Sequence, residues 1–175
     1  PEPRPVWTPT VTARRIGREQ PILEADPEME YKVRAMLLYR FTDYVTWPSP
    51  GGDAAIRICV LGKNPFGGYL DRIVAGARGK GGRVFRVERL AAEADPESCR
   101  QCQVLYVGAG QNAERVARSL AGSPVLVVTE DTGAGVIDFV REERKVKFVL
   151  NLKRAESAGL TVAELLQDLA VRVER

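Results

Sequence analysis

Three short, almost entirely apolar runs constrain the fold of this chain more than any other feature. They are AIRICVLG at Ala55–Gly62, CQVLYVG at 102–108 and SPVLVVTE at 123–130. A strand that is apolar on both faces is typical of a parallel sheet covered by helices on both sides. The segments at 63–76 and 109–122 have helical spacing, and RVFRVERL at 83–90 alternates like a further strand. The sequence therefore predicts an α/β fold with a mostly parallel central sheet, flanked by helices on both faces.

A helix is expected before the first strand, from about Glu28 to Tyr44. Its apolar positions form a wide face at helical spacing: Val33, Met36, Leu37, Tyr39, Phe41, Tyr44 and Val45. Trp47-Pro48 ends this helix, because the residue before a proline resists the α conformation. After the first strand, Asn64 is a good N-cap and Pro65 a good first residue, so the second helix is expected from there to about Ala75.

The C-terminal part predicts a hairpin followed by two helices. VIDFVREERKVKFVLN at 136–151 contains two strands with a charged tip at 141–144, which gives an antiparallel hairpin at one edge of the sheet. LKRAESAG then forms a short helix. TVAELLQDLAVRV at 161–173 predicts an amphipathic helix in which Thr161 and Glu164 make a capping box. Its expected buried residues are Val162, Leu165, Leu166, Leu169 and Val173.

The N-terminal segment differs in composition from the rest. Residues 1–27 hold six of the 11 prolines and show neither helical nor strand periodicity, so we expect an extended, mobile leader. The chain starts at Pro1 rather than Met, from which we expect that a signal peptide has been removed. The expected organisation is a leader over 1–27 and one α/β domain over 28–175.

Charge and composition exclude several classes of function. The net charge is +3, from 26 basic and 23 acidic residues, without the basic stripe typical of nucleic-acid binding. No apolar run reaches the roughly 18 residues of a membrane-spanning helix. The chain has no histidine, which removes Ser-His-Asp and Cys-His catalysis and zinc sites that use histidine. We expect no catalytic set, no metal and no cofactor.

The ends of the predicted strands are the best place for a small ligand. Gly62, Asn64 and Gly108 follow the first and third strands, where open α/β sheets bind ligands. Their spacing matches neither a dinucleotide fingerprint nor a P-loop, so tight turns are the simpler interpretation and a small pocket the alternative. The two carboxylates of EDTG at 130–133 are expected in a solvated loop, without a catalytic role.

Three cysteines leave the pairing open. Cys59 lies in the first strand and Cys102 opens the third, and strands one and three are often neighbours in such sheets, so a Cys59–Cys102 disulfide is geometrically possible. Cys99 lies in the polar segment 91–101, which we expect to be a linker, and forms C-x-x-C with Cys102. Three reduced cysteines, or a pairing of Cys99, are the alternatives.

The end of the first helix is a candidate partner surface. Its apolar face is expected to pack on the sheet, but Tyr44 and Trp47 come at the end of the helix, beside Arg40 and Asp43. Exposed aromatic residues next to charges are typical of interface hot spots. We therefore interpret these four residues as a candidate surface for a protein partner.

Four ordered motifs give the chain a likeness to a known family. YKVRAMLLYRFTDYVTWP, IRICVLGKNPFG, CQVLYVG and VKFVLNLKRAESAGL followed by ELLQDLA resemble the YfiR-like family in order and spacing, over about Tyr31 to Val171. The Pro-rich leader lies outside this likeness.

The resemblance implies a non-enzymatic periplasmic regulator made with a signal peptide. The best-known member represses an inner-membrane diguanylate cyclase through its periplasmic sensor domain, and an OmpA-type outer-membrane lipoprotein can sequester it, which promotes biofilm through cyclic-di-GMP. Relatives also stand beside sensor kinases, and members form dimers. Cys59 and Cys102 match the paired cysteines of the family, which favours that disulfide and a redox-responsive regulator. The alternative function is a periplasmic small-ligand sensor that uses the pocket at Gly62, Asn64 and Gly108.

Overall fold

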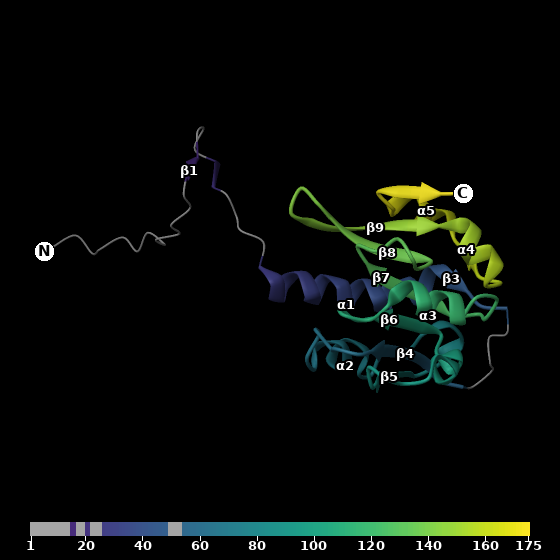
Figure 1. Ribbon diagram of the computed structural model, residues 1–175. Coiled ribbons are helices and arrows are strands. Elements are labelled where there is room, and N and C mark those ends of the chain that lie inside the picture. The colour runs from purple at the N-terminus through teal and green to yellow at the C-terminus, as the bar shows by residue number, and fades with distance from the viewer. Residues whose placement is uncertain (1–14, 17–19, 22–25, 49–53) are drawn as a thin grey trace, which may run out of the picture.

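A seven-stranded sheet forms the centre of the computed structural model, which describes residues 15–16, 20–21, 26–48 and 54–175 (Figure 1). The strand order is β11-β9-β8-β7-β6-β4-β5. The strands are β4 (Ile56–Leu61), β5 (Phe85–Leu90), β6 (Val104–Val107), β7 (Leu126–Glu130), β8 (Ile137–Glu142), β9 (Lys145–Asn151) and β11 (Arg172–Glu174). All neighbouring pairs are parallel except β8 and β9. The predicted α/β fold is confirmed, and β11 adds a strand outside the predicted hairpin.

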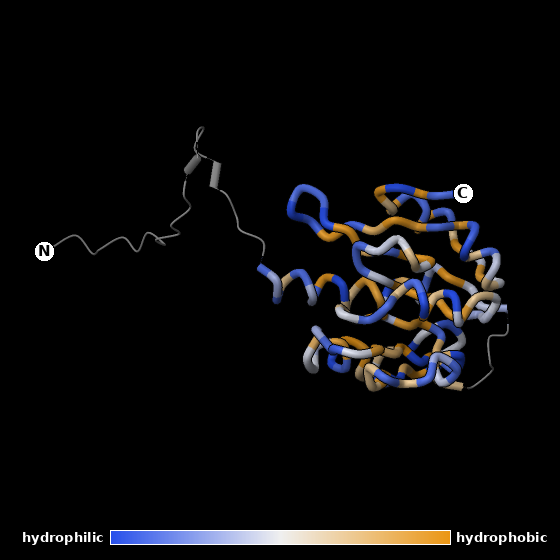
Figure 2. The backbone as a smooth tube through the Cα atoms, in the orientation of Figure 1, coloured by the Kyte–Doolittle hydropathy of each residue, from blue (hydrophilic) through white to orange (hydrophobic). Residues whose placement is uncertain are grey.

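Helices cover both faces of the sheet and divide the core into two clusters. On one face, α1 (Pro27–Tyr44), α2 (Tyr69–Val74) and α5 (Glu164–Leu169) bury the larger cluster. On the other face, α3 (Ala113–Ser119) and the 3₁₀ helix η2 (Pro96–Gln101) bury the smaller one. The hydrophobic colour in Figure 2 follows the strands, while the tip of the β8–β9 hairpin is hydrophilic. The sheet is thus buried on both sides, as its apolar strands require.

The first helix packs on the sheet through a narrower face than its spacing predicts. Asp26 caps α1 by accepting a hydrogen bond from the Glu28 N–H at 3.0 Å. Phe41 is fully buried and packs against Phe139 and Phe148 of the hairpin, with ring centroids 5.9 and 5.2 Å apart. Val33 and Met36, expected on the buried face, are exposed instead.

The second helix is shorter than predicted, because a turn replaces its first residues. Asn64 caps this turn and not the helix: its side chain accepts from the Phe66 N–H at 3.1 Å and donates to the Gly67 carbonyl at 3.0 Å. Gly67 has a φ of +56°, which helical backbone does not adopt, so α2 starts only at Tyr69.

The C-terminal segment is the largest departure from the predicted elements. Thr161 and Val162 form strand β10, which pairs antiparallel with β3 (Val45–Thr46), and Ala163 donates its N–H to the Tyr44 carbonyl. The predicted capping box is therefore absent, and α5 covers only Glu164–Leu169. Leu165 and Leu169 are 55% and 58% exposed, and Val173 belongs to β11. The strand pairing of Thr161 and Val162 with β3 therefore replaces the first turn of the predicted helix.

Four smaller elements complete the described part of the chain. They are β1 (Arg15–Ile16) paired with β2 (Gln20–Pro21), the 3₁₀ helix η1 (Lys80–Gly82) and α4 (Leu152–Ser157). The β1–β2 pair lies within the segment expected to be an extended leader, most of which lies outside the described residues. The expected linker at 91–101 contains η2, which buries Cys99 in the smaller cluster.

Candidate functional site

The parallel strands β5, β4 and β6 are neighbours in the sheet, with β4 in the middle. Their carboxyl ends therefore lie side by side along one edge of the sheet. Gly62 and Gly108, for which tight turns were the simpler interpretation and a pocket the alternative, form tight backbone contacts. The Gly108 N–H donates to the Leu61 carbonyl at 2.9 Å, and a Cβ on Gly108 would lie 2.7 Å from the Lys63 carbonyl oxygen. A Cβ on Gly62 would lie 2.7 Å from the Gln111 amide nitrogen. Neither these glycines nor Asn64 lines any of the three hollows described below.

A hollow of about 280 Å³ lies beside this edge, between the start of α1 and the turn before α2. Tyr31, Phe66 and Tyr69 form its aromatic part, and the Tyr31 and Phe66 rings meet edge to face at 6.0 Å. Lys32 and Arg72 lie over the Tyr69 ring, with 5.6 and 5.8 Å from their charged groups to its centroid. Cations held over an aromatic face in this way are attracted to the ring only weakly.

A buried network of charges connects α1 to the sheet next to this hollow. Arg34 is 6% exposed, and its Nε lies 3.5 Å from Glu130 Oε1 at the end of β7. Its Nη1 lies 3.7 Å from Glu30 Oε2, one helical turn earlier. Glu30 in turn accepts a hydrogen bond from Nε of Arg141 on β8 at 3.0 Å. The network thus ties the start of α1 to β7 and to the hairpin, which run side by side in Figure 1.

Glu130 is the centre of this network, which corrects the expectation of a solvated EDTG segment for Glu130 only, since Asp131, Thr132 and Gly133 are exposed. Its side chain is 17% exposed and accepts hydrogen bonds from the hydroxyls of Tyr106 and Tyr31, the second at 3.4 Å. Arg34 Nε is buried without a hydrogen-bond partner, and the guanidinium is held by the charges of Glu130 and Glu30 and by the Tyr31 ring, whose centroid lies 4.8 Å from Cζ. A buried ion pair of this kind stabilises a fold only while both partners are present.

The two tyrosines bind their protons more tightly than tyrosines in water. Burial raises the pKa of the Tyr106 hydroxyl far above its ordinary value, and the hydrogen bond to Glu130 and its negative charge add to the increase. Burial also raises the pKa of Tyr31, again with a contribution from the Glu130 charge. Both hydroxyls therefore stay neutral donors to Glu130 across the physiological range.

Raising the pH above 10 is therefore expected to destabilise the protein through Tyr106. An unfolded tyrosine loses its proton near pH 10, whereas the folded protein keeps the Tyr106 proton. The unfolded state then binds fewer protons, and the free energy of unfolding falls by about 1.4 kcal/mol per pH unit above 10. Urea denaturation at pH 9, 10 and 11 measures this slope. The Tyr106→Phe variant should lose the contribution of Tyr106 and keep those of Tyr31 and Cys99, whose pKa values burial also raises. An unchanged slope in that variant would contradict the buried hydroxyl.

Cys59 and Cys102 form a disulfide, with their Cα atoms 6.0 Å apart. The bridge joins β4 to the residue that follows η2, just before β6 starts, and both cysteines are buried. β4 and β6, which correspond to the first and third predicted strands, pair directly in the sheet, so these two strands are neighbours as expected. Cys99 is a buried free cysteine, and burial raises the pKa of its thiol, so it stays protonated and unreactive in the folded state.

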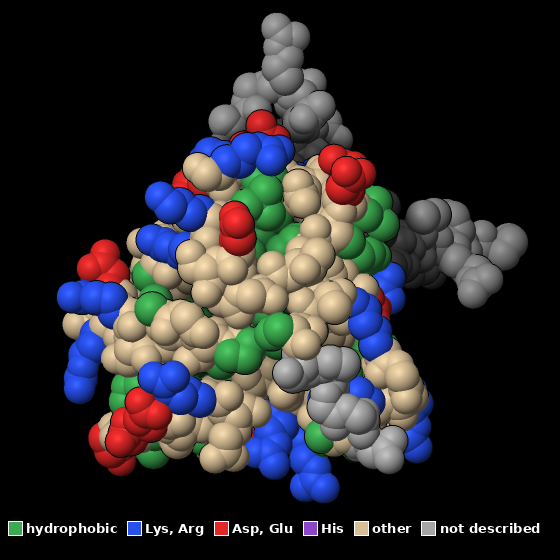
Figure 3. Space-filling model, turned by 90° about the vertical axis from the view of Figure 1, so that its right-hand side faces the viewer, with side chains coloured by type: hydrophobic (Ala, Val, Ile, Leu, Met, Phe, Trp, Pro, Cys, Tyr) green, Lys and Arg blue, Asp and Glu red, His purple; other side chains and the backbone are tan. Residues whose placement is uncertain are grey.

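The candidate partner surface divides into an exposed part and a half-buried part. Arg40 and Asp43 are exposed and form an ion pair at 3.8 Å. Trp47 is half-buried and donates its indole N–H to the Gln103 carbonyl at 3.1 Å, and Tyr44 is also half-buried against the core. Trp47 lines a hollow of about 200 Å³ next to Thr46. Figure 3, seen from the side where α1 passes into β3, shows hydrophobic side chains only in small separate patches.

A longer exposed stripe on α1 includes Arg40 and Asp43. Met29, Val33 and Met36 precede them at spacings of three and four residues, so all five lie on one side of the helix. The three apolar members are 55%, 39% and 40% exposed. We call these five residues the α1 stripe. Its apolar half was missed in the sequence because the same residues fit a broad buried face.

The network around Arg34 was also missed, although helical spacing contains a signal for it. Arg34 precedes Leu38 and Phe41 by four and seven positions, which are buried residues on one face of α1. The described residues contain no group of three or more histidine, cysteine or acidic side chains that could hold a metal ion. Within them, no helix is long and apolar enough to cross a membrane. The arrangement fits a rigid scaffold with an exposed helical stripe.

Comparisons with known proteins match the chain to a family and to a fold. Residues 31–171 match the family described as YfiR/HmsC-like. No curated protein matches the sequence. A crystal structure of a conserved domain protein from Vibrio cholerae O1 biovar El Tor strain N16961 is similar, with a TM-score of 0.51 and 14% identity over 82% of this chain. The ABC domain in complex with L-Trp from Streptococcus pneumoniae has a TM-score of 0.49 and 12% identity over 82% of this chain. The chain spans 60% of the length of each of these two structures, and the likeness to the first shows an α/β fold.

Proposed function

The chain belongs to the YfiR/HmsC-like family, whose members are periplasmic regulators in the diguanylate cyclase pathway rather than enzymes, and on this premise we propose that it represses a cyclase directly. The protein binds the periplasmic sensor domain of an inner-membrane diguanylate cyclase and holds it inactive, which limits cyclic-di-GMP and biofilm formation. The match over residues 31–171 is the observation that carries this proposal, because it includes the whole central sheet except its last strand. By the same likeness, an OmpA-type outer-membrane lipoprotein sequesters the protein, and the protein forms a homodimer.

The α1 stripe is the surface that fits a helical or flat protein partner best. Its apolar half, from Met29 to Met36, is exposed on a helix that the network around Arg34 holds rigidly against the sheet. A rigid apolar strip with charged residues at its end loses little conformational entropy on binding, and its charges help to select the partner. Arg40 and Asp43 provide that charged end, whereas Trp47 contributes from the edge as a half-buried, hydrogen-bonded residue.

Val33→Glu is expected to weaken binding to the sensor domain about 30-fold, because it places a charge in the centre of the apolar strip and a hot-spot residue is worth about 2 kcal/mol. Val84→Glu is a matched control, since Val84 is 41% exposed and lies directly before β5, outside the α1 stripe. Both variants should keep the stability of the wild type within about 0.5 kcal/mol. The measurement is capture from an envelope extract, followed by titration of the captured cyclase's periplasmic domain. Wild-type binding by Val33→Glu would remove the stripe from the proposal, and capture of no cyclase or kinase by the wild type would overturn the function itself.

We also propose that binding depends on the oxidised form. The Cys59–Cys102 bridge holds η2 against β4, so its reduction frees the segment that leads into β6. The same capture is repeated after mild reduction. Capture of the cyclase only by the oxidised protein supports a redox-responsive regulator, whereas equal capture assigns the bridge a purely structural role.

A further inference from the structure

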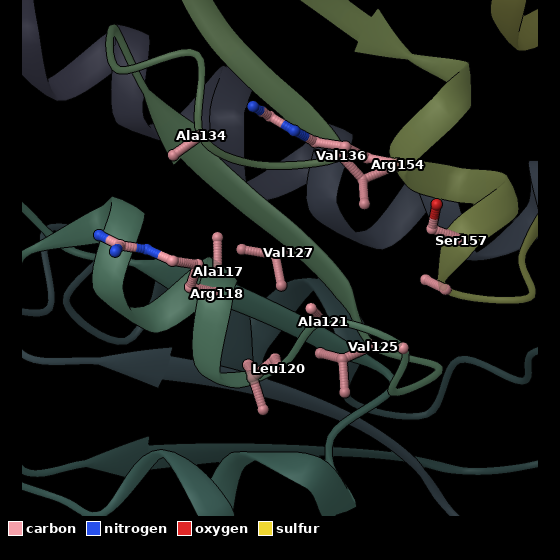
Figure 4. Close-up of a pocket in the computed structure, with 12 residues that line it drawn as sticks. Ala117, Arg118, Leu120, Ala121, Val125, Val127, Ala134, Val136, Arg154 and Ser157 are labelled. Carbon is pink, nitrogen blue, oxygen red and sulfur yellow. The ribbon is translucent and has the colours of Figure 1, made fainter.

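An open hollow of about 280 Å³ lies on the face of the sheet opposite α1, at the start of β7 (Figure 4). α3 and the loop after it form one wall, and α4 with the loop before β8 forms the other. The α1 stripe takes no part in the hollow.

The floor of the hollow is aliphatic and built from small side chains. Val125, Val127 and Val136 form it, and Ala117 and Ala134 leave the space above it open. None of the lining residues is aromatic, so no ring is present on which a planar ligand could stack. A flexible saturated chain fits such a surface, since it needs only apolar contact.

The walls are held in place by arginines that bind backbone carbonyls. Arg154 donates to the Gly133 carbonyl, and to the Gly135 carbonyl at 3.2 Å, which fixes the loop before β8. On the other side, Arg100 donates to the Ser123 hydroxyl at 2.6 Å and to the Ser119 carbonyl at 3.3 Å, which fixes the loop after α3. The hollow is therefore preformed, as ligand sites usually are.

Two guanidinium groups border the hollow without a carboxylate to neutralise them. Arg118 and Arg154 are both exposed, and no carboxylate of residues 26–48 and 54–175 lies within ion-pair distance of either one. In the view of Figure 4 both side chains extend toward the side of the hollow on which Ala134 lies. An apolar floor with two cations at one side is complementary to an anion that has an apolar tail.

We propose that this hollow binds a straight-chain carboxylate of roughly six to ten carbons, the size of ligand that a site of this volume holds. The alkyl chain lies on Val125, Val127 and Val136, and the carboxylate meets Arg118 and Arg154. This inference is independent of the cyclase partner. A protein partner on the same face is a different occupant, which the experiment below distinguishes.

Titration calorimetry with butanoate, hexanoate and octanoate tests the site. Each added methylene is expected to lower Kd about fourfold, corresponding to about 0.8 kcal/mol of buried CH₂. Octanol, which has the chain without the charge, should bind at least about fivefold more weakly than octanoate. Equal affinity for octanoate and octanol, or the absence of saturable octanoate binding, would overturn the proposal.

Variants place the binding in this hollow. Arg118→Gln is expected to raise the Kd of octanoate about fivefold, whereas Arg115→Gln, an exposed arginine of α3 outside the hollow, should leave it unchanged. Ala121→Phe fills the hollow from an exposed position and should abolish binding while the protein stays folded. Octanoate binding that survives Ala121→Phe would overturn the site, as would capture of a protein through this face by a wild type that does not bind octanoate.

Discussion

Glu130→Ala is expected to lower the free energy of unfolding by about 3–5 kcal/mol, the cost of leaving a buried charge without its partner. Arg34 would keep only Glu30 at 3.7 Å, and the hydroxyl of Tyr106 would lose its acceptor. Urea denaturation at pH 7, followed by circular dichroism, measures the change. Asp43→Ala is the control. It breaks the exposed Arg40–Asp43 ion pair on α1, the helix that contains Arg34, and should cost at most about 1 kcal/mol.

A second substitution separates the charge effect from lost packing. Arg34→Met combined with Glu130→Leu replaces the whole pair with apolar side chains, and Glu30 remains bound to Arg141. The part of the loss that comes from the unpaired Arg34 charge should return, since apolar residues in place of a buried ion pair are often neutral or stabilising, whereas the Tyr106 hydroxyl lacks its acceptor in both variants. If the double variant is no more stable than Glu130→Ala, the cost lies in packing and in the Tyr106 hydroxyl. If Glu130→Ala itself costs less than about 1 kcal/mol, water reaches Arg34.

Replacing Cys59 and Cys102 together with alanine is expected to cost about 4 kcal/mol of unfolding free energy. The two residues are 43 positions apart. Without the bridge the unfolded chain gains conformational entropy, and for a loop of this length the gain stabilises the unfolded state by about 4 kcal/mol. Thermal or urea denaturation with and without reductant measures it. The reduced wild type should match the double variant, and reductant should not change the variant. A wild type whose stability is the same in both conditions would contradict a stabilising bridge.

The elements that the sequence predicted well are those whose residues carry a local pattern. The apolar strands were located within one to three residues, because a strand buried on both faces has to be apolar throughout. A Cys59–Cys102 bridge was possible because strands one and three are often neighbours in such sheets, the family resemblance favoured it, and the structure shows β4 beside β6 with the bridge formed. The hairpin likewise follows from two apolar segments around a charged tip.

Predictions failed where a distant partner competed with a local preference. Helical spacing at 161–173 is strong, but the exposed backbone of β3 offered Thr161 and Val162 a strand to pair with. Asn64 has the chemistry of a helix cap, but the glycine at 67 uses a backbone conformation outside the helical region, so Asn64 caps a turn. Of the candidate sites, Gly62 and Gly108 form the tight turns that were the simpler interpretation, and the two aromatic residues of the partner surface, Tyr44 and Trp47, are half-buried against the core.

By itself, the sequence determined the α/β class, the order of the apolar strands and the family, because these depend on apolar periodicity and motif order along the chain. Only the tertiary structure decided that Arg34 and Glu130 are buried together. Tyr31 and Glu130 are 99 positions apart, and nothing near either residue shows that α1 crosses the end of β7. The α1 stripe has the same origin: a helix with a wide apolar face can bury only the side that meets the sheet, and the packing of α1 decides which apolar residues stay exposed.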